Sequence, residues 1–120
     1  MAYKCEKNNN TLQVTVSGIN KLNEQVSVYC DVHNKIVDKA ITYILFDFSD
    51  AILKLKLIDV AEVITKISNH WKKNSHIEKI VVIPGADRPR LDMINVKLMH
   101  LKYPVYVCES SSEVQQQLVC

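Results

Sequence analysis

The sequence predicts an α/β fold with a mostly parallel sheet, and three features point to it. Residues Ile41–Phe48 form a run rich in β-branched and aromatic residues in which Asp47 is the only charge, typical of a central strand buried on both faces. Downstream, strand and helix patterns alternate, which implies right-handed crossovers and parallel pairing. Upstream, two strand patterns flank a turn, so we expect a hairpin with one antiparallel strand at the edge of the sheet.

Length and composition indicate one ordinary globular domain covering residues 1–120. Apolar residues make up 48% of the chain and charged residues 23%, and the formal net charge is +2. That charge is too small to indicate a nucleic-acid partner. No apolar run approaches the roughly 20 residues that span a bilayer, and the polar start MAYKCEKNNN lacks a signal-peptide core. We therefore expect a cytoplasmic protein without a transmembrane segment.

The first half of the chain reads as a hairpin followed by a helix. Strands are expected at Ala2–Lys7 and Thr11–Gly18, because Asn8–Asn10 between them is a turn signal. In the second strand apolar and polar residues alternate, so one face meets a core. Apolar residues at helical spacing then predict a helix over Asn23–Lys39.

The second half alternates helices and strands after the central strand. We expect these elements in order: a loop at Ser49–Leu57, a helix over Val60–Trp71, a strand at Ile77–Ile83, a helix beginning near Pro89, a strand at Tyr103–Cys108 and a short helix at Ser110–Leu118. Asp59 and Glu62 have the spacing of a capping box, which predicts that Asp59 caps the Val60–Trp71 helix.

Four short motifs, in this order, resemble those of one known family. They are VTVSG at Val14–Gly18, ILFDFSD at Ile44–Asp50, Pro89 with Leu91 and Leu98 in the third helix, and YPVYVCESSSEVQQQL at Tyr103–Leu118. Together they resemble the STAS domain of bacterial anti-sigma factor antagonists and of the cytoplasmic tails of sulfate transporters. The resemblance covers nearly the whole chain. It implies a mixed, mostly parallel sheet with an antiparallel edge strand and with helices mainly on one face.

One motif of that family is missing. Antagonists carry Asp-Ser-Ser-Gly or a close variant at the start of the second helix, where the partner kinase, itself the anti-sigma factor, phosphorylates a serine. Counting on from Asp47, the motif should fall on Leu55–Ile58, which contains no hydroxyl group, and the nearest are Ser49 and Thr65. The resemblance therefore implies a protein partner, an anti-sigma factor or kinase-like regulator, without the usual phosphoswitch.

The sequence offers no convincing catalytic or metal site. Asp47 would suit the phosphoacceptor of a response-regulator receiver, but CEKNNN and SGIN lack the acidic pair that a receiver needs, so a bond to backbone amides is the simpler interpretation. Cys30 and His33 could form one side of a metal site, but no second ligand pair accompanies them. No nucleophile elbow or phosphate-binding glycine loop is present. We expect no enzyme activity, no cofactor and no metal, and we expect reduced thiols at the four cysteines, namely Cys5, Cys30, Cys108 and Cys120.

Basic and apolar residues follow the two expected central strands. Lys54 and Lys56 come after one strand and Arg88 and Arg90 after the next. In a parallel sheet both loops lie at the carboxyl ends, so these residues could form one basic rim near a helix start, where anions are favoured. The apolar residues of the first loop would add a protein-docking surface if they are exposed; they are Ile52, Leu53, Leu55 and Leu57.

Two functional hypotheses follow. The first is a regulatory protein-interaction module that binds its partner through Ser49, Lys54, Leu55, Lys56 and Leu57. The alternative is a STAS-like domain that binds a small anionic ligand, a nucleotide or lipid headgroup, with Arg88 and Arg90 in a weak anion site, as in a transporter-associated subunit. For Leu55 and Leu57, two outcomes are open: they face outward as anchors for the partner, or they turn inward and pack the helix start.

Overall fold

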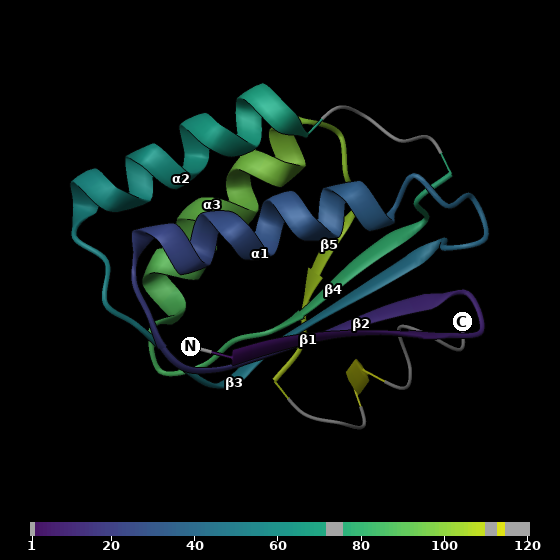
Figure 1. The fold of residues 1–120 in the computed structure, drawn as a ribbon, viewed down its shortest axis with the longest axis horizontal. Coiled ribbons are helices and arrows are strands. Elements are labelled where there is room, and N and C mark those ends of the chain that lie inside the picture. The colour runs from purple at the N-terminus through teal and green to yellow at the C-terminus, as the bar shows by residue number, and fades with distance from the viewer. Residues whose placement is uncertain (1, 72–75, 110–112, 115–120) are drawn as a thin grey trace.

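The computed structural model describes residues 2–71, 76–109 and 113–114 of the chain. The elements run in the order β1-β2-α1-β3-α2-β4-α3-β5 (Figure 1). Their bounds are β1 Ala2–Asn8, β2 Thr11–Asn20, α1 Leu22–Lys35, β3 Tyr43–Leu53, α2 Leu57–His70, β4 Lys79–Ile83, α3 Arg88–His100 and β5 Val105–Val107.

The sheet confirms the predicted fold class. Its spatial order is β1-β2-β3-β4-β5, with β1 antiparallel to β2 at one edge and β2 to β5 parallel to one another. Figure 1 shows α1, α2 and α3 side by side on one face of the sheet, with α2 packed between the other two. None of the described helices is long and apolar enough to cross a membrane.

The main core lies between the helices and the inward side chains of the sheet. Val14, Phe46 and Val82 are register neighbours on β2, β3 and β4 and form one buried row across the sheet. From the helical layer, Tyr29 and Trp71 contact this core, and the indole Nε1 of Trp71 donates a 2.9 Å hydrogen bond to the backbone oxygen of Tyr29. This bond satisfies the one polar atom of a large buried aromatic side chain, so its apolar area is buried without an unpaired donor.

The central strand is buried on both faces, as predicted. On the face opposite the helices, Leu45 of β3 and Val81 of β4 pack with Cys108 and Val114 in a second, smaller cluster. Because helices cover one face of β3 and this cluster the other, a nearly continuous apolar run is the pattern expected there.

The predicted loop at Ser49–Leu57 is wrong. β3 continues to Leu53 and α2 already begins at Leu57, which leaves only residues 54–56 as a connection. The extra strand length comes from pairing with the end of β2, because the β2–β3 register shifts after Thr15 and continues from Ser17 to Asn20. This long-range pairing leaves no local signal in the sequence.

Two smaller expectations also change, and a third lies mostly outside the described residues. Lys56, not Asp59, is the N-cap of α2, because the helix begins three residues earlier than its apolar stripe suggested. Helix α1 ends at Lys35, and the following turn is closed by the Asp38 carboxylate, which accepts the N–H of Ala40 at 3.0 Å. The short helix predicted for Ser110–Leu118 lies mostly outside the described residues.

Gly85, in the turn between β4 and α3, provides a test of the packing. A β-carbon at this position would overlap the carbonyl oxygen of Phe48 and lie 3.2 Å from that of Ala51, so no side chain fits against β3. We predict that Gly85→Ala lowers the free energy of unfolding by about 2–3 kcal/mol, through strain in a closely packed region. Urea unfolding followed by the fluorescence of Trp71, the single tryptophan, measures this. Ala86→Ser, at the exposed neighbouring position, is the control, and an equal loss in both variants contradicts the explanation.

Candidate functional site

The site candidate is the edge of the molecule where β2, β3 and β4 end and all three helices begin, at the left of Figure 1. The connection from β3 to α2, residues 54–56, crosses this edge. Its first residue is fastened to β2, because the N–H of Lys54 donates to the backbone oxygen of Asn20 at 2.8 Å. Asn20 is itself fully buried, and its side-chain Nδ2 donates to the backbone oxygen of Gly18 at 3.1 Å.

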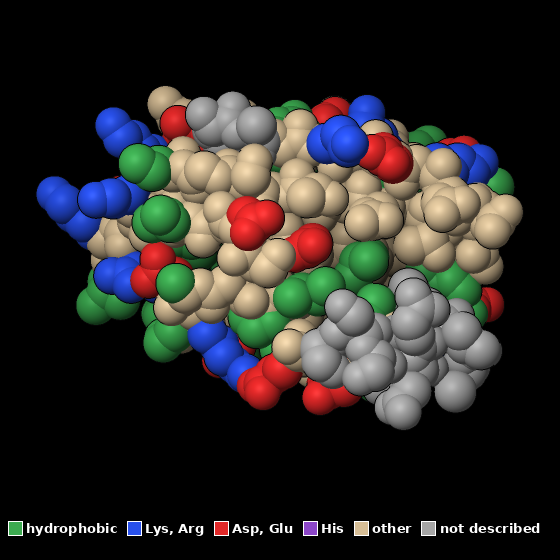
Figure 2. Space-filling model, turned by 90° about the horizontal axis from the view of Figure 1, so that it is seen from below, with side chains coloured by type: hydrophobic (Ala, Val, Ile, Leu, Met, Phe, Trp, Pro, Cys, Tyr) green, Lys and Arg blue, Asp and Glu red, His purple; other side chains and the backbone are tan. Residues whose placement is uncertain are grey.

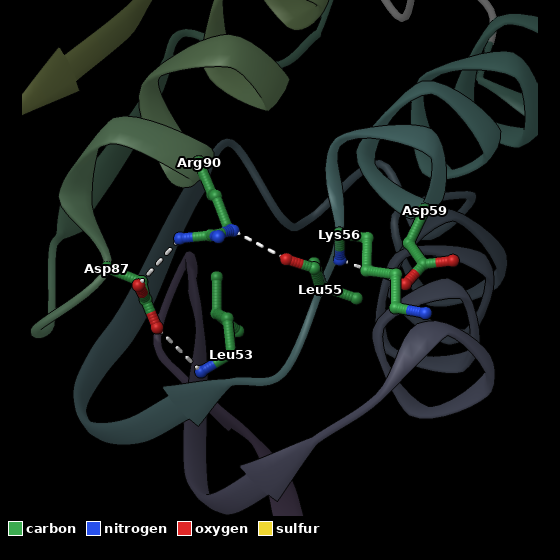
Figure 3. A network of polar contacts seen from close by, with 6 residues as sticks. All are labelled: Leu53, Leu55, Lys56, Asp59, Asp87 and Arg90. Carbon is green, nitrogen blue, oxygen red and sulfur yellow. Dashed lines mark hydrogen bonds and ion pairs between the residues drawn. The ribbon is translucent and has the colours of Figure 1, made fainter.

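Two residues at the start of α3 hold the rest of the connection (Figure 3). Asp87 accepts the N–H of Leu53 at 3.2 Å through Oδ2, and through Oδ1 it accepts a 3.1 Å bond from Nη1 of Arg90. The Nε of Arg90 donates to the backbone oxygen of Leu55 at 2.6 Å. Hydrogen bonds with a charged partner are stronger than neutral ones. This arrangement, called here the Asp87–Arg90 clamp, fixes the backbone on both sides of Lys54.

The clamp decides which side chains of the connection face solvent. Leu55 is 4% exposed and belongs to the main core, whereas Leu57 is 70% exposed and Ile58 is 71% exposed. The hypothesis that Leu55 binds a partner is therefore corrected: with its carbonyl bound by Arg90, its side chain turns inward and packs under the helix start. Leu57 is exposed, as the docking hypothesis requires.

The start of α2 combines a helix end with a lysine. Lys56 is the N-cap, and its N–H donates to Oδ2 of Asp59 at 3.0 Å. Asp59 thus satisfies one of the free N–H groups at the helix start. The side chain of Lys56 is exposed and adds a positive charge at the positive end of the helix dipole. This combination favours an incoming anionic group.

A shallow groove of about 470 Å³ runs along this edge. Its lining residues come from the end of β3, the connection and the start of α3, and they are Ile52, Leu53, Lys54, Leu55, Lys56, Asp87 and Arg90. The structure thus brings together six of the residues named from the sequence, namely Ile52, Leu53, Lys54, Leu55, Lys56 and Arg90.

Three of the named residues do not line the groove, namely Leu57, Ser49 and Arg88. Ser49 is exposed, but its N–H and hydroxyl both bond to Oδ1 of Asp47, at 3.0 and 2.6 Å. Arg88 pairs with Glu109 and lies 3.7 Å from Asp92, so it is not part of the groove lining with Arg90. The expected pair of arginines is therefore divided between two different ion-pair networks.

Further exposed apolar side chains extend the edge, of which the sequence had indicated Ile52 but not Ile19 or Ile58. Ile19 of β2 and Ile52 of β3 are register partners, and each is 49% exposed. Together with Leu57 and Ile58 they place large aliphatic side chains beside the lysines, and apolar and basic side chains gather at the left of Figure 2, the same end of the molecule. A signal was present: Ile19 breaks the even-numbered apolar alternation of its strand, and Ile58 lies off the apolar stripe of α2.

The described residues do not support a metal site at Cys30 and His33 or reactive cysteines. Among residues 2–71, 76–109 and 113–114, no group of three His, Cys, Asp or Glu side chains could hold a metal ion. The His33 ring lies 5.6 Å from that of Trp71, as part of the packing. Cys5, Cys30 and Cys108 are free thiols, and burial raises the pKa of Cys5 and Cys108, which keeps both protonated at neutral pH.

Comparison with known proteins finds similarity in structure only. No protein-family model matches the chain, and no curated protein matches it in sequence. An uncharacterized Shewanella loihica protein of the DUF3478 family, with a SpoIIAA-like fold, superposes with a TM-score of 0.60 at 12% identity, over 98% of this chain and 92% of that one.

The anti-sigma factor antagonist SpoIIAA has the same fold. Its unphosphorylated form gives a TM-score of 0.56 at 11% identity, over 98% of this chain and 97% of that one. The phosphorylated form of SpoIIAA, the Bacillus cell fate determinant, gives 0.52 at 11% identity over 98% and 99% of the two chains. The chain therefore has a SpoIIAA-like fold, which is the fold expected from the resemblance of the sequence motifs to the STAS domain.

The clamp makes a specific prediction. Arg90→Met keeps the aliphatic stem but removes the donor to the Leu55 carbonyl, and we expect a loss of about 1–2 kcal/mol in unfolding free energy, since the guanidinium is partly exposed. Amide hydrogen exchange should also accelerate locally, at Leu53 and along residues 54–56. Asp92→Ala, which removes a carboxylate near Arg88 instead, is the control. Unchanged exchange at Leu53 in Arg90→Met would show that the clamp does not hold the connection.

Proposed function

We propose that the chain is a regulatory protein-interaction module that resembles an anti-sigma factor antagonist and acts by binding rather than by catalysis. The fold of SpoIIAA, an anti-sigma factor antagonist, supports this proposal. The partner is a protein, of the anti-sigma factor or kinase-like regulator class. It docks on the edge formed by the connection and the start of α2.

The observation that carries the proposal is the exposure of Leu57 and Ile58. Both lie in the first turn of α2, and both leave most of their aliphatic surface in water. They occupy the position at which the resemblance places the phosphorylated serine motif of antagonists. Exposed aliphatic side chains next to lysines are the pattern of a docking surface with a charged rim.

Regulation differs from that of the antagonists in this proposal. Phosphorylation adds about −1.5 to −2 charge to a serine, but residues 55–58 offer no hydroxyl group, and Lys56 places a permanent positive charge there. Partner binding is then constitutive or controlled by the abundance of the protein.

A second candidate function rests on the groove. Lys54, Lys56 and Arg90 line one side of it, which would suit a small anion such as a nucleotide or lipid headgroup. In that case saturable binding should weaken steeply as salt rises, because exposed charges are screened over about 10 Å at 0.1 M. Titration with nucleotides and acidic lipids measures it, with Arg90→Ala as the loss-of-binding variant.

Site-specific photo-crosslinking tests the protein-partner function. A benzophenone amino acid at position 57, in protein expressed in its native cell, should yield one dominant crosslinked protein, identified by mass spectrometry. Val37 is also 70% exposed but follows α1 at the opposite end of that helix, so crosslinking there is the matched control. Recovery of the same protein from both positions, or of none from position 57, contradicts the proposed docking edge.

Two substitutions should lower the affinity for that partner. Leu57→Asp removes an aliphatic anchor, and we expect at least a tenfold weaker complex, whereas Val37→Asp should leave it unchanged. Lys56→Glu imitates the charge of a phosphorylated surface and should weaken the complex about tenfold as well. Isothermal titration calorimetry with the purified partner measures both. Lys56→Glu binding as well as the wild type would remove the role of that charge.

Intact-mass analysis of protein from its native cell tests the missing phosphoswitch. We expect the unmodified mass. Stoichiometric phosphate on Ser49, or on any residue between Ser49 and Thr65, would show that the switch had moved within the chain.

A further inference from the structure

We infer that the partner presents an acidic amphipathic segment to this edge, with carboxylates facing Lys54, Lys56 and Arg90 and apolar side chains facing Leu57 and Ile58. The inference rests on the proposed function and adds the chemistry of the partner to it. It depends on three properties of the edge. Its lysines form no ion pair among the described residues, its carboxylates already accept other hydrogen bonds, and exposed aliphatic side chains lie in the adjoining first turn of α2.

The two lysines of the connection lack an anionic partner among the residues that the structure describes. Within the described residues, Lys54 and Lys56 form no ion pair through their side chains, although five other basic residues do, namely Lys4, Lys7, Lys35, Arg88 and Arg90. Both lysines are exposed. Their charges are therefore available to a ligand from outside.

Among the described residues, neither Asp87 nor Asp59 forms an ion pair with Lys54 or Lys56, and both carboxylates accept other hydrogen bonds. Asp87 uses one oxygen for the N–H of Leu53 and the other for Arg90, and Asp59 accepts the N–H of Lys56. Arg90 uses Nε and Nη1 in the clamp, which leaves Nη2 without a hydrogen bond among the described residues. A carboxylate that enters the groove would meet this nitrogen, the lysines and the positive end of α2.

The apolar part of the edge favours a protein segment over a lipid or a free anion. Polybasic lipid-binding surfaces use about four to eight Lys or Arg residues, whereas the connection has two unpaired lysines. Phosphate sites at helix starts use free backbone N–H groups in a glycine-rich loop, and here Asp59 occupies the N–H of Lys56. An amphipathic helix with acidic flanks would satisfy both the lysines and the exposed Leu57 and Ile58.

Two designed peptides test this chemistry directly. Both have about 18 residues, or five helical turns, with the same leucine face, and they carry either glutamate or lysine on the flanks. In titrations of ¹⁵N-labelled protein, the shifts of the amide signals of residues 52–58 report binding. We expect the acidic peptide to bind with at least tenfold higher affinity than the basic one. Raising salt from about 50 to 300 mM should weaken the acidic peptide at least fivefold through screening.

Charge-reversal variants locate the effect. Lys54→Glu with Lys56→Glu should weaken the acidic peptide at least tenfold and strengthen the basic one. Lys39→Glu makes the same change at an exposed site in the turn between α1 and β3, at the opposite end of the molecule, and should change neither affinity. Lys54→Gln with Lys56→Gln, which introduces no new charge, should give an intermediate loss. Thermal unfolding of each variant checks that the fold is retained.

Several outcomes would overturn the inference. They are equal binding of the two peptides, signal shifts centred outside residues 52–58, no shifts with either peptide, or no difference between Lys39→Glu and the connection variants. Two further probes are inorganic phosphate and vesicles with about 30% phosphatidylserine, an anionic lipid of the cytoplasmic leaflet. If either binds at residues 52–58 more tightly than the acidic peptide, the edge is assigned to that ligand. If the inference fails but position 57 still crosslinks one protein, the proposed function stands with a partner of other chemistry. Failure of the crosslink alone removes the function.

Discussion

The candidate site depends on one contact, the hydrogen bond from Arg90 to the backbone oxygen of Leu55. A connection of three residues between a strand and a helix could leave either Leu55 or the following Leu57 in solvent. Because Arg90 binds this carbonyl and Asp87 binds the N–H of Leu53, the backbone has one orientation, with Leu55 in the core and Leu57 outside. Asp87 is the N-cap of α3 and Arg90 lies in its first turn, so the candidate site combines parts of the chain more than 30 residues apart.

The clamp in turn requires α3 to begin close to the end of β3. Gly85 makes this approach possible, because its α-carbon lies against the carbonyl oxygens of Phe48 and Ala51, where no side chain fits. Pro89 in the first turn of α3 gives up an N–H that has no partner within the helix, which is the position where proline is tolerated. A glycine with no obvious role in the sequence thus determines where Asp87 and Arg90 lie. Their side chains can then reach β3 and the connection.

The fold could be predicted from the sequence because its signals are local. The apolar run of β3, the alternation in β2 and the helical stripes each report the burial of neighbouring residues, and the alternation of strands with helices predicts a mostly parallel sheet. The site could be predicted only in part. Lys54, Lys56 and Leu57 follow from position along the chain, but the burial of Leu55 depends on the distant Arg90. Ile19 was missed although it breaks the alternation of its strand, because its pairing with Ile52 depends on the register shift between β2 and β3.

The electrostatics of the edge give the proposed module a different control from that of a phosphorylated antagonist. Phosphorylation of a serine changes the charge of the docking surface, so one protein has two affinities for its partner, one in each phosphorylation state. Lys56 has one charge at physiological pH, and it lies at the positive end of α2, where that charge is least favourable for the free protein. A partner carboxylate would offset the repulsion between the Lys56 charge and the positive end of the helix dipole. Part of the proposed affinity would therefore come from relieving a repulsion that is present in the free protein. In the proposed function, such a surface would select partners by charge and release them when concentration falls or ionic strength rises.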